Sequence, residues 1–236
     1  MPAWSAVRGV TPALGAAWAR ELLVLARSND TRAGFGVALA GVFLLLVLQE
    51  VSPPFAVVWA QLVVFANASS AFNVFGHDAR AVDRLRLLPI RSDQIMAAKS
   101  AALLTGMALQ LAPFWVACTI RFGFTVSAAT VLSSVASALG FALLGPAISI
   151  YCAAARTGRS EGTPSDAGGI PGALTAVLVG GLAVAGGLMA LHAPARGFTA
   201  CAAAVACEGA GCRWAWGWLG RRFDARFETL RDRLRA

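Results

Sequence analysis

Few side chains in this chain of 236 residues are arranged to do chemistry. Its two histidines, His77 and His192, stand far apart in the sequence, and neither belongs to a motif with a nucleophile or with metal-ligand spacing. The single lysine, Lys99, is followed by Ser100 but preceded by Ala98, so it does not complete a phosphate-binding loop. We therefore expect no enzyme activity and no cofactor, and we expect any ATP hydrolysis to come from another chain.

The cysteines also fail to form a reactive or metal-binding set. There are five of them, an odd number, and all lie in or beside apolar segments, where a cysteine behaves as a small hydrophobic residue. Their spacings match no zinc pattern. We expect neither a disulfide framework nor a metal site at Cys118, Cys152, Cys201, Cys207 and Cys212.

The composition identifies the class of protein that must position the remaining polar residues. Hydrophobic residues make up 58% of the chain, charged residues only 14%, and the mean hydropathy is +0.67. Soluble chains have about 25% charged residues, so these values predict an all-α integral membrane protein. The length leaves no room for a separate soluble domain, and the 1–236 chain is expected to be a single membrane domain. The net charge of +8 therefore does not indicate a nucleic-acid partner.

Six apolar segments are candidates for transmembrane helices, each near the roughly 20 residues that a crossing needs. The first is short, and the sixth contains Glu208 and Arg213, which are costly in a membrane. We retain the sixth because losing it would place the six arginines that follow Leu219 outside. The six segments are Ala33–Gln49, Phe55–Phe75, Ser100–Ile120, Val126–Tyr151, Ile170–Leu191 and Phe198–Leu219.

The positive charges set the orientation of these segments. With six spans and a cytoplasmic N-terminus, 17 of the 20 Lys and Arg residues lie on the cytoplasmic side. We therefore expect a multi-pass protein of the plasma membrane, in a bacterium the cytoplasmic membrane, with both termini in the cytoplasm. The basic inner face is expected to attract anionic lipids.

Amphipathic segments precede and follow the six spans. Residues 11–28 predict an interfacial helix, with Thr11 as its cap and an apolar face of Leu14, Trp18, Leu22 and Leu25 that excludes Glu21. Asn29 or Asp30 is expected to cap the first span. The cytoplasmic tail, residues 220–236, predicts another amphipathic helix, with an apolar stripe of Phe223, Phe227, Leu230 and Leu234.

The loop between the second and third spans predicts a short helix. Asp78 is suited to cap it, Val82, Leu85 and Leu88 form its apolar stripe, and Pro89 ends it. Lys99 then enters the third span as an expected interface anchor. Such a helix suits docking into a groove of a cytoplasmic partner, and it equally suits lying on the lipid surface.

The same loop carries a resemblance to a known family. Asn73, Gly76 and Asp78, then Leu88-Pro89, then Lys99 resemble the intracellular loop of type 2 permease subunits of ATP-binding cassette (ABC) transporters. That family also has an N-terminal interfacial "elbow" helix and six spans. The resemblance implies a coupling helix seated on an ABC ATPase subunit, a dimer with a second permease chain, and export. The implied ATPase-coupling residues are Gly76, Asp78, Arg80, Arg84, Leu85, Leu88, Pro89, Ile90 and Lys99.

Two other functions remain open from the sequence. Glu208 and Arg213 form a candidate intramembrane polar site, and ionisable groups within spans are typical of ion-coupled secondary transporters. A non-transporting membrane scaffold or assembly protein fits the composition as well. The uncharged polar residues of the spans either line a path or join neighbouring helices by hydrogen bonds: Gln61, Asn67, Asn73 and Gln110.

Overall fold

The computed structural model describes residues 12–48, 50–75, 90–152 and 169–235, and all regular structure in those ranges is α-helical. Among the described helices, four are long and apolar enough to cross a membrane. They are α2 (Asn29–Val47), α6 (Ser92–Phe122), α7 (Phe124–Cys152) and α8 (Gly169–His192). The prediction of an all-helical chain with membrane-spanning helices is confirmed at this level.

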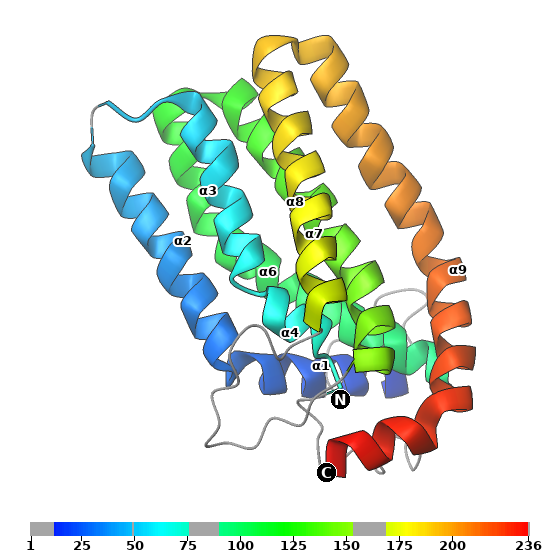
Figure 1. The fold of residues 1–236 in the computed structure, drawn as a ribbon. Coiled ribbons are helices and arrows are strands. Elements are labelled where there is room, and N and C mark those ends of the chain that lie inside the picture. The colour runs from blue at the N-terminus through cyan, green and yellow to red at the C-terminus, as the bar shows by residue number, and fades with distance from the viewer. Residues whose placement is uncertain (1–11, 49, 76–89, 153–168, 236) are drawn as a thin grey trace.

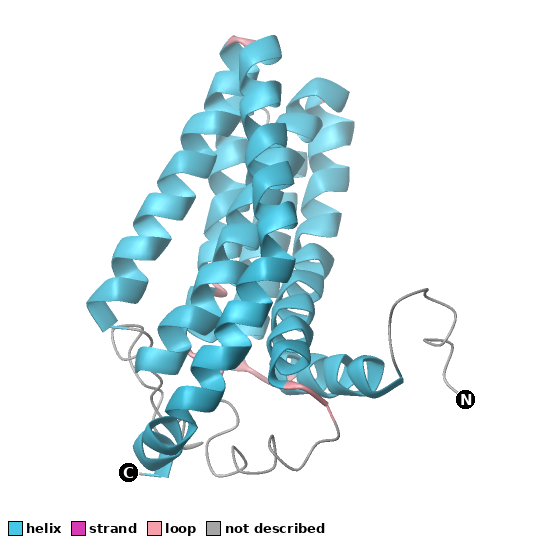
Figure 2. Ribbon diagram, turned by 90° about the vertical axis from the view of Figure 1, so that its right-hand side faces the viewer, coloured by secondary structure: helices cyan, strands magenta, loops and turns pink. Residues whose placement is uncertain are grey.

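The long helices form a bundle that is closed at one end by α1. Helices α2, α3 (Pro53–Phe65), α6, α7, α8 and α9 (Pro194–Arg235) stand side by side, and α1 (Pro12–Ala26) lies across their lower ends in Figure 1. The last turns of α9 bend under the same end, as Figure 2 shows from the side. We call this end the basal end. The short connections α2–α3, α6–α7 and α8–α9 all lie at the opposite end.

The second predicted span is not one helix. The sequence predicted an uninterrupted segment from Phe55 to Phe75, but the structure has α3, a turn, and then the five-residue helix α4 (Ala68–Phe72). The break falls at Asn67, which has φ −97° and ψ 0°. Its Nδ2 donates to the Val63 carbonyl at 2.9 Å and to Gln110 Oε1 at 2.6 Å. An asparagine that bonds to its own helix competes with regular helical bonding, which accounts for the interruption.

The first span begins earlier than predicted, and its cap is a different residue. Helix α1 ends at Ala26, and Ser28 caps α2 by accepting a hydrogen bond from the Thr31 N–H at 3.2 Å. Neither Asn29 nor Asp30, the predicted caps, has this role, because both already lie in the first turn of α2. A carboxylate in that turn is favourable because of the helix dipole.

The sixth apolar segment and the tail form one continuous helix, α9, of 42 residues. Its predicted apolar stripe is confirmed where the side chains are described: Phe223, Phe227 and Leu230 are at most 3% exposed. They pack with Phe75 and other apolar side chains into a cluster at the basal end. The tail therefore closes the bundle instead of forming a separate helix.

Candidate functional site

The expected coupling loop lies mostly outside the described residues. Gly76, Asp78, Arg80, Arg84, Leu85, Leu88 and Pro89 all fall in the range 76–89. The structure does describe both flanks of this range. On one side is Phe75, and on the other are Ile90 and the start of α6 at Ser92. The described part of the site consists of the contacts that hold these two flanks.

Both flanks are fixed on α9. The Phe75 ring stacks on the Phe223 ring with centroids 5.0 Å apart, and the Phe75 N–H donates to Ser149 Oγ of α7 at 3.1 Å. Ile90 packs against the same basal cluster. On the same flank as Ile90, Ser92 Oγ donates to Asp224 Oδ1 at 2.6 Å. A displacement of the 76–89 segment would consequently be transmitted to α9.

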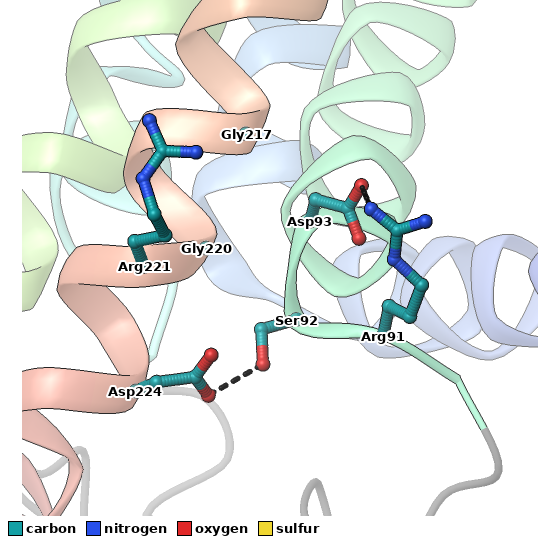
Figure 3. A pocket seen from close by; sticks show the side chains of 7 residues that line it. All are labelled: Arg91, Ser92, Asp93, Gly217, Gly220, Arg221 and Asp224. Atoms are coloured by element: carbon teal, nitrogen blue, oxygen red, sulfur yellow. Dashed lines mark hydrogen bonds and ion pairs between the residues drawn. The ribbon is translucent and has the colours of Figure 1, made fainter.

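Figure 3 shows how closely α6 and α9 meet at this point. A Cβ atom at Gly220 of α9 would lie 2.7 Å from the Asp93 backbone nitrogen, so only glycine permits this approach. A pocket of about 340 Å³ opens beside the contact. On its α6 side Arg91 Nη2 pairs with Asp93 Oδ2 at 2.9 Å, and on its α9 side the Arg221 guanidinium extends along the helix toward Gly217. The junction combines a backbone contact with fixed charges.

Lys99 joins α6 to the helix that crosses the base. Its Nζ lies 2.9 Å from Glu21 Oε2 of α1, and the two side chains are 1% and 9% exposed. Arg20 Nη1 binds the other carboxylate oxygen of Glu21 at 2.8 Å. Lys99 Nζ also contacts the Val74 carbonyl at 3.4 Å and lies 5.3 Å from the centroid of the Phe75 ring. Lys99 was expected to be an interface anchor, but it forms a buried ion pair because α1 lies directly against α6.

Both residues of the second predicted site, Glu208 and Arg213, lie in α9. Glu208 lies in α9 and lines a cavity of about 200 Å³ between α7, α8 and α9. Its Oε2 is buried and has no hydrogen-bond partner among the described residues. Arg213 follows five residues later, which places it about 140° around the helix from Glu208. The side chain of Arg213 lies outside the described residues, and the backbone positions alone do not bring the two residues together.

The uncharged polar residues of the spans divide into two kinds. Asn67 and Gln110 bond to each other, and Gln110 Nε2 also donates to the Thr31 carbonyl at 3.3 Å. They join α2, α6 and the α3–α4 break, which is the hydrogen-bonding role that the sequence left open. Gln61 is 1% exposed, and neither atom of its amide has a partner among the described residues. Ser137 Oγ of α7 is buried without a partner in the same way.

Gln61 and Ser137 occupy facing positions of α3 and α7. One turn above them, a Cβ atom at Gly187 of α8 would touch both Val57 and Ser133. One turn below them, the Phe65 and Phe141 rings meet with centroids 5.9 Å apart. The positions four residues after Val57 and Ser133 are Gln61 and Ser137, so the two groups without partners lie at the same level in the bundle. They are polar groups in the bundle interior whose hydrogen bonds the described fold does not supply.

Sequence reasoning missed Glu21 and the surroundings of Glu208. Glu21 was assigned to the polar side of an interfacial helix, yet it is the only charged residue of α1 that is buried. The signal for it is the lone Lys99, because a lysine in an apolar span requires a carboxylate from a neighbouring element.

Among the described residues, no three His, Cys, Asp or Glu side chains are close enough to hold a metal ion.

Comparison with known proteins does not assign the chain to a family. No family model matches it, no curated protein matches it, and no solved structure matches it.

Proposed function

We propose that the protein is the permease subunit of an ABC transporter. It forms an export pathway as a dimer with a second permease chain and is driven by a separate ATPase subunit. In this arrangement it spans the cytoplasmic membrane six times, with the basal end and both termini in the cytoplasm. Helix α1 is the interfacial elbow, and the 76–89 segment carries the coupling helix.

The observation that carries the proposal is the buried Glu21–Lys99 ion pair. It ties α1 to α6 seven residues after the start of α6, the first described helix after the proposed coupling segment. With the Phe75–Phe223 stack and the Ser92–Asp224 hydrogen bond, it connects the flanks of that segment to α1, α6 and α9 at once. A force applied by an ATPase at residues 76–89 would therefore reach three helices through close contacts.

The six-span count rests on charge and arrangement together. Beyond the four long apolar helices, α3 with α4 supplies a broken span and α9 supplies a polar one. Both stand in the bundle alongside the other four in Figure 1. A broken helix is acceptable in a membrane when neighbouring helices satisfy its backbone and polar groups, as Gln110 does for Asn67. The arginine-rich end of α9 and the helix α1, which carries Arg20, lie at one end of the bundle, as a single cytoplasmic face requires.

Co-purification tests the proposal directly. The tagged protein is purified in mild detergent from its native membrane, and bound chains are identified by mass spectrometry. We expect a protein with a phosphate-binding loop, and we expect Leu85→Glu to lose it while the permease still elutes as a single species. Phe124→Glu, at an 81% exposed position at the opposite end, is the matched control and should keep it. If neither the wild type nor the control retains an ATPase, the scaffold alternative replaces this proposal.

One observation favours the ion-coupled alternative, namely the buried Oε2 of Glu208, which has no hydrogen-bond partner among the described residues. The two transport mechanisms are separated in membrane vesicles by their energy source. An ABC permease requires ATP inside the vesicle and continues to work when ionophores collapse the ion gradients. Transport that stops with the ionophores and ignores ATP would favour the secondary transporter.

A further inference from the structure

The cavity beside Glu208 has apolar walls and one polar group. Its floor is made of small, nearly buried side chains, Ala136 and Ala183 at 7% exposed and Cys201 at 4%. Cys201, Ala204 and Glu208 follow one another along one face of α9, so the carboxylate lies at one end of the cavity. Glu208 Oε1 lies near Gly140 of α7, where an added Cβ atom would be 3.5 Å from it.

The position of Glu208 excludes the ordinary partners of a carboxylate. Glu208 lies about 15 Å along α9 from either end of the 198–219 segment, which in the proposed six-span layout is the middle of a hydrocarbon layer about 30 Å thick. Lipid headgroups do not reach that depth. A carboxylate oxygen without a hydrogen bond is energetically costly in such surroundings. A hydrogen-bond donor, preferably a cationic one, removes that cost. The described residues supply none to Oε2.

The cavity opens sideways, toward the surface that lipid would cover. Leu182 and Ala200, on the two helices that flank the opening, are both exposed, Leu182 at 75%. Leu178, one turn from Leu182 toward the basal end of α8, is 64% exposed, and Leu174 one turn further is 58% exposed. These leucines form an apolar track that starts at the opening. A ligand that has dissolved in the bilayer would reach the cavity without crossing water.

From these features we infer that the cavity binds the primary ammonium head of a single-chain cationic amphiphile taken from the bilayer. A volume of about 200 Å³ holds the ammonium group and the first carbons of the chain. The rest of the chain lies along the leucine track of α8. The ammonium N–H groups donate to Glu208 Oε2, which completes a buried ion pair. As a transport substrate the amphiphile rests on the proposed function, whereas its binding to this cavity can be measured without the ATPase.

Binding is measured with radiolabelled dodecylamine on the purified protein in nanodiscs of neutral lipid. Empty nanodiscs give the background for partition into lipid. We expect saturable binding that unlabelled dodecylamine displaces and that dodecanol, with the same chain but no charge, does not. Glu208→Gln should weaken binding about tenfold or more, because the charge-assisted bond is lost while shape is kept.

Matched variants distinguish loss of the binding site from loss of the fold. Glu228→Gln, on the same helix in the exposed tail, should bind like the wild type. Ala204→Leu fills the cavity while keeping the carboxylate, and it should also abolish saturable binding, which covers the case in which Glu208→Gln does not fold. Equal binding by Glu208→Gln, or equal competition by dodecanol, overturns the inference. Saturable binding combined with failure to recover an ATPase would reject the proposed function and leave the ligand site standing.

Discussion

The buried pair at the base makes a prediction in which the two partners are not equivalent. Glu21 accepts from both Arg20 and Lys99, whereas Lys99 is the more deeply buried member. Glu21→Gln removes the negative charge 2.9 Å from a lysine that is 1% exposed. Lys99→Met removes the positive charge and leaves Glu21 with Arg20 at 2.8 Å. The first change should therefore cost more than the second.

The magnitude follows from the cost of removing one partner of a buried ion pair. Removing one partner of a buried pair typically costs about 3–5 kcal/mol, which for a chain of this size lowers Tm by roughly 6–20 °C. We expect Glu21→Gln near the upper part of that range. Lys99→Met should cost about 1–2 kcal/mol. The Glu21 side chain, which is 9% exposed, keeps Arg20 as its cation, and methionine fills most of the lysine volume.

The assay is thermal unfolding of the protein in detergent, followed by the fluorescence of its tryptophans. The double variant Glu21→Gln with Lys99→Met should recover most of the loss caused by Glu21→Gln alone, since both charges of the pair are then removed together. Arg91→Met, which breaks an ion pair at an 80% exposed side chain, is the control and should change Tm little. The reasoning is refuted if Lys99→Met is the more damaging single change, or if the double variant is no more stable than Glu21→Gln.

Three further predictions concern packing and polar groups, each read from Tm with its control. Gly34→Ala should lower Tm, because a Cβ atom there would overlap the Gln110 side chain, whereas Gly36→Ala on the same helix meets nothing within 4 Å and should leave Tm unchanged or slightly raised. Gln61→Leu should stabilise the fold by about 1–3 kcal/mol, because it removes two buried polar atoms that have no partner among the described residues. Asn67→Leu is its control and should destabilise the fold, because it removes the hydrogen-bond partner of Gln110. The opposite order of stability would show that Gln61 has a structural partner. Gly220→Val should separate α9 from the start of α6 and lower Tm, while Gly209→Val, with open space around it, should be tolerated.

Much of the fold follows from hydropathy and the distribution of arginine, because both reflect the solvent on each side of a helix. The four long apolar helices and the stripe of Phe223, Phe227 and Leu230 were predicted for this reason. The break at Asn67 was not, because an isolated asparagine in an apolar segment has the same local signature whether or not its helix continues. The outcome depends on Gln110, 43 residues away in sequence, to which Asn67 bonds. Ser28, and not the predicted Asn29 or Asp30, caps the helix, and local chemistry does not separate these residues because serine, asparagine and aspartate cap helices about equally well.

The site was harder to predict than the fold because it depends on which polar groups lack a partner. From composition alone, Asn67, Gln110, Gln61 and Glu208 are equivalent, since each is a polar residue in an apolar segment. In three dimensions Asn67 and Gln110 satisfy each other, and Glu21 satisfies Lys99, so these four residues are explained by stability. Pairing between distant segments has no local signature in one sequence, which is why Glu21 was placed on the wrong side of its helix.

The groups that remain unpaired are therefore the better candidates for function. A stable bundle gains nothing from burying an amide or a carboxylate oxygen without a hydrogen bond, and each such group costs about 1–3 kcal/mol or more. Gln61, Ser137 and Glu208 carry that cost on the two sides of α7, Gln61 toward α3 and Glu208 toward α9. If the cost is offset by a ligand, loss of Glu208 or Gln61 should raise Tm of the isolated protein while reducing ligand binding or transport. A variant that gained both stability and activity would show that these groups serve neither ligand binding nor transport.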